Sequence, residues 1–307
     1  MTITFVTEPT AYQGFSVPDY VSPSNKGTNT ADCVINVTAT ASPLEVRLVD
    51  PDDSNNPITD WVTITSGVDT AIDVPANDTN YIIEARENGS GNTYSTNYFA
   101  CGIPDYIGGQ SLANAMITAL SGGTLASNGI TPHPAARAFC RTSAESTPAW
   151  VQISDSTYAD SAFAAEYLNE RIAQTGVAVF LVGVTVGATS IGFFTPTGTY
   201  WSDTETVLNE VGYVANVIWY HGHNNVGNVT VDYANQVRHI IYGLEAISSK
   251  TIENIFIGGI PNLASGSFGT AEELNDLRAG MKFLGDRKSN WYYTGKATDR
   301  DWETTRS

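Results

Sequence analysis

The sequence predicts two regions of different fold class, an all-β region over residues 1–100 and an α/β region with a parallel sheet after residue 100. In the first region, short runs of alternating apolar and polar residues recur at roughly ten-residue spacing. In the second, apolar strands alternate with helical patterns of 10–17 residues. A chain of 307 residues is long for one average domain and comfortable for two.

The first region consists of period-two segments separated by turn residues. The segments are CVINVTATA, LEVRLVD, WVTITS, AIDVP and NYIIEAR, and the clearest turns between them are DPDDSNNP and ENGSGN. Successive side chains of a strand point to opposite faces, so these patterns predict strands with one buried face. Because no helix interrupts them, they predict an antiparallel β-sandwich of immunoglobulin-like type without a catalytic constellation.

The second region shows strands and helices in alternation. A helix over 161–174 precedes a strand over 177–187 that is apolar enough to be buried. The apolar side of that helix carries Phe163, Tyr167, Leu168 and Ile172. The later elements are a helix near 202–212, a strand over 216–222, a helix near 231–247, a strand over 254–261, a helix that opens with the capping-box spacing Thr270-x-x-Glu273, and a strand over 290–295. Repeated β-α-β units predict a parallel sheet with helices on both faces.

Composition and charge exclude several classes of protein. A hydrophobic content of 42% and an aromatic content of 10% rule out a disordered or collagen-like chain. No stretch of about 18 consecutive apolar residues is present to span a bilayer. The formal net charge is −17, and residues 1–100 hold thirteen Asp and Glu against three Lys and Arg. Such a surface repels phosphate backbones and anionic membranes, so we expect neither nucleic acid nor a membrane as a partner.

The cysteines give no sign of a metal site. Cys33, Cys101 and Cys140 are few and odd in number, without a C-x-x-C motif and without a histidine at metal-ligand spacing beside them. One disulfide is compatible with this count, and its pairing stays open. We expect neither a metal nor an organic cofactor.

The first residues, MTITFVTEPTAYQ, lack the basic n-region and the apolar h-region of a secretory signal peptide. Either the chain is not exported by that route, or it leaves its cell in another way, for example in a virus particle. With the modular layout, this favours an extracellular or virion-associated location and other virion or cell-surface proteins as partners.

Parallel α/β sheets bind ligands beyond the carboxyl ends of their strands. Three loops of the second region fall at such places, and they contain Gly108-Gly109-Gln110-Ser111, Gly187, and His221, His223, Asn224 and Asn225. A serine nucleophile needs a base that accepts its proton and donors about 3 Å from the oxyanion that it generates. Glycines offer bare backbone N–H groups, and His and Asn offer polar side chains, so the three loops are the candidate site.

Two interpretations of Ser111 follow from its own loop. The pair of glycines allows a sharp strand-to-helix turn that leaves the Ser111 N–H near a helix N-terminus, where negative charge is favoured. Alternatively, Ser111 is a serine that caps the helix. A loop with two His and two Asn is also compatible with ordinary turn chemistry.

The segments GGQSLAN, GATSI and WYHGHNN, in this order and with these gaps, resemble the first three conserved blocks of the SGNH hydrolases. The resemblance is to the branch of sialate O-acetylesterase-like enzymes and plant-type carbohydrate acetylesterases, with the blocks G-Q-S-N, G-G-T-S/P and W-Y/H-Q-G-E-S-N/D. It covers about residues 101–295 and implies a flavodoxin-like three-layer α/β/α sandwich. A weaker resemblance of the first region is to β-sandwich modules that precede esterase domains in phage tail and secreted bacterial proteins.

The resemblance implies a role for several residues. Ser111 matches the nucleophile and, through its N–H, one oxyanion donor, and Gly187 matches the glycine that donates a second N–H. Asn224 matches the asparagine whose side-chain amide is the third donor. His221 stands where the carbohydrate-esterase branch has a glutamine, and His223 stands in place of that branch's glutamate. Leu112 replaces the asparagine that follows the nucleophile, and such departures weaken any inference about substrate preference.

The catalytic base of the family is absent from its expected place. It is a histidine in a D-x-x-H block after the last strand, and no histidine follows His239. Residues 296–307 read instead as an irregular tail, KATDRDWETTRS, with six charged residues. We therefore expect a truncated chain whose native Asp–His pair is missing. His221 or His223 is the alternative, as a substitute base.

Two functions compete on this basis. The first is a serine ester hydrolase that removes O-acetyl or similar acyl groups from carbohydrate through a Ser111 acyl-enzyme. The second is an inactive protein that binds an acetylated glycan, a polysaccharide or a receptor, for example in a phage tail. An α/β-hydrolase fits poorly, because the serine lies in G-x-S-x-A rather than G-x-S-x-G. No G-x-G-x-x-G supports a dinucleotide-binding fold.

Overall fold

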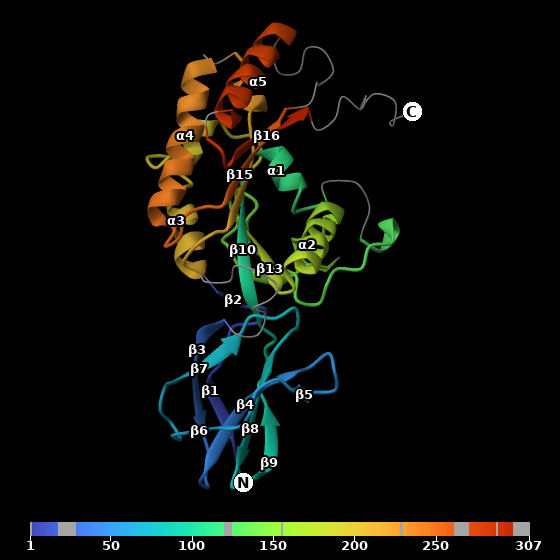
Figure 1. Cartoon of the computed structure of the whole chain (residues 1–307), viewed down its shortest axis with the longest axis vertical. Helices are drawn as coiled ribbons and strands as arrows, with labels where there is room; N and C mark the ends of the chain where they lie inside the picture. The colour runs from blue at the N-terminus through green and yellow to red at the C-terminus, as the bar shows by residue number, and fades with distance from the viewer. Residues whose placement is uncertain are drawn as a thin grey trace. The chain divides into compact units, whose positions relative to one another are not determined.

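The computed structural model describes residues 2–17, 29–119, 125–154, 156–227, 230–260, 270–286 and 288–296. Within these ranges the chain is a mixed α/β protein with antiparallel and parallel strands (Figure 1). Its residues form two compact units. Unit 1 comprises Met1–Ile103, Gly123–Ala138 and Trp150–Phe180, and unit 2 comprises Pro104–Gly122, Phe139–Ala149 and Leu181–Ser307.

The amino-terminal part of unit 1 contains two antiparallel sheets. The first has the order β1-β3-β7, and the second has the order β5-β4-β8-β9 with β6 also paired to β4. The strands are β1 (Thr4–Thr7), β3 (Thr30–Thr38), β4 (Leu44–Asp50), β5 (Asn56–Pro57), β6 (Val62–Ile64), β7 (Thr70–Pro75), β8 (Ile82–Glu87) and β9 (Ser90–Tyr94). The five segments read as strands from the sequence all overlap strands of these sheets. Their packing as an immunoglobulin-like sandwich stays a prediction.

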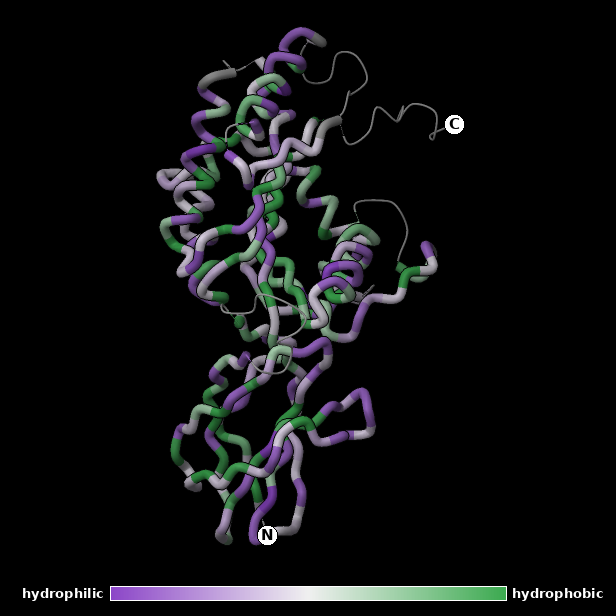
Figure 2. Tube along the Cα trace, in the orientation of Figure 1, coloured by the Kyte–Doolittle hydropathy of each residue, from purple (hydrophilic) through white to green (hydrophobic). Residues whose placement is uncertain are grey.

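Alternating burial explains why these segments form strands. On β3, the buried side chains of Cys33, Ile35 and Val37 are two residues apart, and their neighbours are more exposed. Leu44, Val46 and Leu48 repeat this spacing on β4. Each sheet thus removes one apolar face from water, while the loop before β5 is strongly hydrophilic (Figure 2).

A third sheet has the order β12-β11-β13-β10-β14-β15-β16, with β2 also paired to β10. Its strands are β2 (Gly14–Ser16), β10 (Ala100–Gly109), β11 (Arg137–Arg141), β12 (Trp150–Gln152), β13 (Ala178–Thr185), β14 (Asn216–Tyr220), β15 (Asn254–Gly259) and β16 (Trp291–Lys296). The pairs β10–β14, β14–β15 and β15–β16 are parallel, which confirms parallel pairing for this part of the predicted sheet. The sequence did not predict β2, which pairs in parallel with the first residues of β10.

A ladder of polar side chains joins three of these strands. Asp105, Asn216 and Asn254 are register partners on β10, β14 and β15. The Asn216 amide donates to Asp105 Oδ1 at 2.7 Å, and the Asn254 amide donates to Asn216 Oδ1 at 2.8 Å. Asp105 and Asn216 are buried, so a register slip would leave their polar groups without these partners.

The helices of unit 2 are α1 (Ser111–Ala115), α3 (Trp201–Val211), α4 (Thr230–Ile247) and α5 (Ala271–Gly285). α4 contacts both α3 and α5, and α5 packs against β15 and β16. In Figure 1, α4 and α5 lie on one side of this part of the sheet and α1 lies on the other. α2 (Ala162–Thr175), which the sequence predicts as another helix on a face of the sheet, belongs to unit 1. The complete three-layer arrangement therefore stays a prediction.

One helix face differs from the prediction. The buried side chains of α2 are Ala164, Ala165, Leu168 and Ile172. Phe163 remains 36% exposed and stacks on Tyr167, with ring centroids 5.8 Å apart. Small alanines thus form half of the packed face, because they let the helix approach its neighbours closely, and the larger rings pack on each other beside it. In the part of the chain that the structure describes, no helix is long and apolar enough to cross a membrane.

Candidate active site

Ser111 is the first residue of α1, directly after the carboxyl end of β10. The N-cap is Gln110 rather than Ser111, so the interpretation of Ser111 as a capping serine is wrong. The Ser111 side chain is half-buried and makes no hydrogen bond to any described residue. α1 has only five residues, so its dipole is small, and any stabilisation of an oxyanion here depends on individual N–H groups.

The two glycines before Ser111 are required by close backbone packing. A Cβ atom on Gly109 would collide with the Tyr220 carbonyl of β14. Gly109 also has φ +138°, a backbone conformation that residues with a Cβ atom rarely adopt. A Cβ atom on Gly108 would lie 2.7 Å from the Tyr106 ring and 2.9 Å from the Trp219 ring. The two glycines therefore let the end of β10 pack closely against β14. The chain then turns into α1, which places Ser111 at the edge of the sheet.

Gly187 lies beside Ser111, as the sequence predicts for the second loop. A Cβ atom built on Gly187 meets only the Ser111 Cβ atom, at 4.0 Å. The loop is tied to the nucleophile loop by the Val186 N–H, which donates to the Gly109 carbonyl at 3.1 Å. Within the described residues, the Gly187 N–H has no acceptor, so it is available to a bound ligand.

The third loop follows β14 and contains the short helix η4 (His223–Asn225). Its two asparagines differ in environment. Asn224 is exposed and makes no hydrogen bond to another described residue, whereas Asn225 is buried and accepts the Ile191 N–H at 3.0 Å. Asn224 is thus free to reach a ligand, and Asn225 connects the third loop to the second.

His221 is fully buried beneath the site. Its ring stacks on Trp219 with centroids 5.7 Å apart, and it also contacts Phe194 and Tyr233. Nε2 lies 3.1 Å from the Thr189 carbonyl, which requires a proton on Nε2. Burial lowers the pKa of His221 to about 3, since the charged ring would lose its hydration. A neutral ring with so low a pKa, hydrogen-bonded to the backbone, is ill suited to accept a serine proton.

His223 begins η4, and its residue is only 5% exposed. Its backbone N–H lies 2.8 Å from the side-chain oxygen of Gln110, and the Gln110 amide nitrogen lies 3.0 Å from the Thr189 carbonyl. This orientation of the amide is assigned from its neighbours, a donor on one side and an acceptor on the other. Gln110 therefore contacts both of the other loops.

Sequence reasoning named Gln110 and Asn225 only as loop residues, without a role, and it missed Asn114. Asn114 is buried on α1, and its amide donates to the carbonyls of Thr142 at 2.5 Å and Thr185 at 2.9 Å. The available signal was a polar residue within the otherwise apolar or glycine-rich segment next to each predicted loop. A polar residue that folding buries must find partners, and here the partners are the loops themselves.

The described residues show no base for Ser111. No His, Asp or Glu side chain among them hydrogen-bonds its hydroxyl. Lys296, the first residue of the predicted irregular tail, is the last residue of β16, and the rest of the tail and the predicted D-x-x-H block lie outside the described residues. Likewise, no group of three or more His, Cys, Asp and Glu in the described ranges is arranged to hold a metal. All three cysteines lie in these ranges, as buried thiols rather than disulfides.

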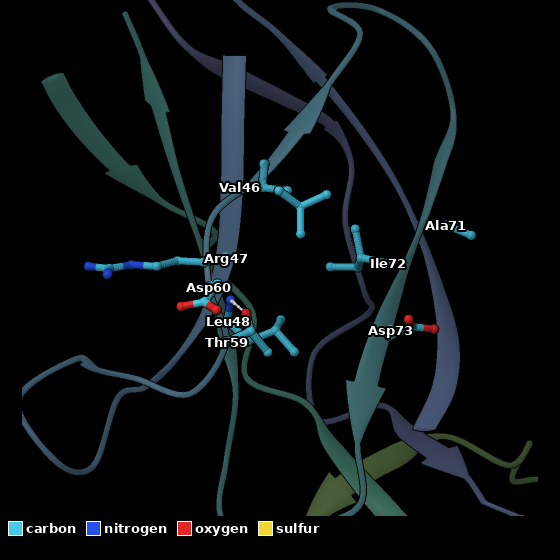
Figure 3. Close-up of a pocket in the computed structure, with 9 residues that line it drawn as sticks. Val46, Arg47, Leu48, Thr59, Asp60, Ala71, Ile72 and Asp73 are labelled. Atoms are coloured by element: carbon cyan, nitrogen blue, oxygen red, sulfur yellow. Dashed lines mark hydrogen bonds between the residues drawn. The ribbon is translucent and has the colours of Figure 1, made fainter. Parts of the chain in front are cut away.

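A separate cavity of about 290 Å³ lies in unit 1, lined mainly by residues of β4, β7 and the segment before β6. Val46 and Ile72 point into it, whereas Arg47 and Asp73 point away (Figure 3). The Leu48 N–H donates to the Thr59 hydroxyl at its edge, at 2.9 Å. This cavity contains none of the residues predicted for catalysis.

Fold and site together define a class, an α/β protein with a serine and a bare glycine N–H side by side at the carboxyl edge of a parallel sheet. No family model matches the chain, and no curated protein matches it in sequence. The fold is similar to that of a carbohydrate acetylesterase from Xanthomonas citri, with a TM-score of 0.51 and 15% identity over 88% of this chain and 63% of that one. The chain thus spans less than two thirds of that enzyme's length, and the likeness shows the fold alone.

Two further solved structures are similar at lower scores. One is a protein from Arabidopsis thaliana, with a TM-score of 0.44 and 17% identity over 62% of this chain and 83% of that one. The other is a carbohydrate esterase family 2 enzyme with a carbohydrate-binding domain from Corynascus thermopiles, with a TM-score of 0.33 and 13% identity over 92% of this chain and 87% of that one. Scores at this level carry no argument about this chain.

Proposed function

We propose that this chain is a serine ester hydrolase that removes O-acetyl or similar acyl groups from carbohydrate through an acyl-enzyme on Ser111. The observation that carries the proposal is the pairing of Ser111 and Gly187, with 4.0 Å between the Ser111 Cβ and the Cβ position of Gly187. A hydroxyl without a partner among the described residues and a backbone N–H without an acceptor there are what acyl transfer requires at one point.

In the proposed reaction, Ser111 Oγ attacks the ester carbonyl carbon and forms a C–O bond, while its proton passes to a base. The carbonyl oxygen becomes an oxyanion that accepts hydrogen bonds from the N–H groups of Ser111 and Gly187 and from the exposed Asn224 amide. The sugar alcohol then leaves with a proton, and water releases the acetyl group from Ser111 by the same steps. These donors stabilise the oxyanion effectively because their loops hold them in position before the substrate binds.

Among the described residues, His223 is the one that we propose as the base that accepts the Ser111 proton. It neighbours Asn224, whereas His221 is held in a stack on Trp219. The carbohydrate substrate is proposed from the fold likeness to a carbohydrate acetylesterase and from the three sequence blocks. Attachment to a polysaccharide or a larger assembly through the β-rich region belongs to the same proposal.

The decisive experiment is acetate release by the full chain from 4-nitrophenyl acetate and from an acetylated oligosaccharide. We expect Ser111→Ala to lower the rate by about 10³-fold or more, since the nucleophile is lost. Thermal unfolding should not change, because the Ser111 hydroxyl has no hydrogen bond to break in the described structure. His223→Gln, measured in parallel, reports whether that ring supplies the base.

Gly187→Ala is the matched test of the oxyanion site. Its methyl group meets only Ser111 Cβ at an ordinary contact distance, so stability should hold while acetate release falls. Unchanged release in Ser111→Ala contradicts the proposal. Absence of release by the unmodified chain, together with binding of the acetylated oligosaccharide, supports the glycan-binding alternative instead.

A further inference from the structure

We infer that Gln110 is a positioning residue, which holds the three loops of the candidate site in the arrangement that esterase chemistry requires. The inference rests on the proposed function of that site and adds a residue to which no catalytic role was assigned. Gln110 directly precedes Ser111 and is the N-cap residue of α1, yet its side chain does not cap the helix. It is fully buried and directed toward the other two loops.

Both ends of the Gln110 amide are used. The nitrogen donates to the Thr189 carbonyl at 3.0 Å, and the oxygen accepts the His223 N–H at 2.8 Å. The same Thr189 carbonyl accepts His221 Nε2–H at 3.1 Å. Thr189 lies two residues after Gly187, and His223 lies directly before Asn224. The side chain of Gln110, the residue next to the nucleophile, thus holds the loops of both other predicted oxyanion donors, Gly187 and Asn224.

The other connections each join only two loops. The Val186 N–H to the Gly109 carbonyl joins the second loop to the first, and Asn225 Oδ1 to the Ile191 N–H joins the third loop to the second. Gln110 alone among these contacts touches all three. The contact matters at this place because α1 is only five residues long and Gly187 is exposed.

Positions of the donors matter because an oxyanion hole acts through distances of about 3 Å. A displacement of about 1 Å costs roughly 10²-fold in rate. A side chain that holds the loops without touching the substrate should therefore change kcat and leave KM nearly unchanged. That split separates a positioning role from a contact with the substrate.

Gln110→Glu is the informative variant because it preserves size and exchanges only the donor. In its ionised form, the introduced carboxylate still accepts the His223 N–H but presents a second acceptor to the Thr189 carbonyl. Protonation restores both hydrogen bonds, since a carboxylic acid has one O–H donor and one carbonyl acceptor. Burial without a cationic partner raises the pKa of such a carboxyl group. The defect should therefore diminish as the pH is lowered.

The experiment compares acetate release by the unmodified chain, Gln110→Glu and the control Gln174→Glu, whose residue is exposed on α2. At pH 8 we expect kcat of Gln110→Glu to fall about 100-fold, with KM changed less than about twofold. The ratio of this kcat to that of the unmodified chain should rise toward one as the pH falls, and a base shared by both proteins cancels in the ratio. The control should match the unmodified chain.

A second measurement keeps this inference separate from the proposed function. Amide hydrogen exchange at Ile191, which lies two residues after Thr189, should be about 10-fold faster in Gln110→Glu at pH 8 and unaffected in the control. If the unmodified chain releases no acetate, the esterase proposal fails, and exchange alone then decides whether Gln110 holds the loops. Unchanged exchange overturns the inference, as does a kcat ratio that is independent of pH.

Discussion

His221 lies fully buried, stacked on Trp219 and donating to the Thr189 carbonyl. From its place in the sequence, it was an alternative base for Ser111, next to His223. Its surroundings instead stabilise one neutral tautomer, because burial removes the hydration that a charged ring needs. The surroundings of His221, rather than its residue type, therefore make it a poor candidate for the base.

We predict that His221 makes the protein less stable in acid. Its pKa is about 3 in the folded protein, against 6.5 for a histidine in water, so the unfolded chain binds more protons between these values. Stability is then fully present above about pH 6.5 and is lost as the pH falls toward 3, by about 1.4 kcal/mol per pH unit. Urea unfolding at pH 7, 5.5 and 4 should show a smaller loss for His221→Gln, whose amide can still donate to Thr189.

His239→Gln is the control for this prediction, because His239 is exposed on α4. It should follow the unmodified chain at every pH. If His221→Gln loses as much stability between pH 7 and pH 4 as the unmodified chain, the folded protein does not exclude the proton from His221.

Among the elements, those with a strong pattern agree with the sequence. β13 is buried at every residue, as its apolar run predicts, and α5 begins with the Thr270–Glu273 capping box. A helix beginning at Ser111 was expected, and α1 confirms it. β2 was not anticipated, because three residues are too few to show a period in the sequence. Its partner β10 lies far along the chain, and only the folded sheet brings the two strands together.

The polar ladder across β10, β14 and β15 leads to a prediction about strand register. Asn216→Asp replaces the amide that donates to Asp105 with a carboxylate in a buried place. The new carboxylate repels that of Asp105, and one hydrogen bond is lost, so we expect a destabilisation of about 2–4 kcal/mol at pH 7.

Urea unfolding of Asn216→Asp against Asn235→Asp checks this expectation, since Asn235 is exposed on α4. The control should change stability by less than about 0.5 kcal/mol. Equal midpoints for both variants would show that the ladder contributes nothing to the sheet.

At the scale of the whole molecule, the predicted boundary near residue 100 has yet to be tested. Unit 1 contains the amino-terminal sheets together with two later segments, the second of which includes α2. Within it, the buried Arg137 guanidinium donates to the Asn80 side chain, and the Ala178 N–H donates to the Asn77 carbonyl at 2.7 Å. Burial lowers the pKa of Arg137 to about 10, so its charge persists and needs these partners at neutral pH.

We therefore predict that a chain starting at residue 99 will not unfold as cooperatively as the full chain. It loses Asn80, one of the acceptors of Arg137, and the Asn77 carbonyl that accepts the Ala178 N–H, and it also loses β2 from the edge of β10. Thermal unfolding followed by near-ultraviolet circular dichroism measures this effect. Asn80→Leu in the full chain should give a partial loss, about 1–3 kcal/mol. A fragment with the melting temperature of the full chain would instead establish residues 101–295 as an independent domain.

The sequence by itself determined the mixed α/β class with a parallel sheet and the three loops at its carboxyl edge. Period and turn chemistry act between near neighbours, so they can be read along the chain. Only the tertiary structure decided that Gly187 faces Ser111, that Asn224 is exposed while Asn225 is buried, and that Gln110 joins the loops. These depend on contacts between residues more than 30 positions apart, where burial and hydrogen-bond geometry assign each polar group its partner.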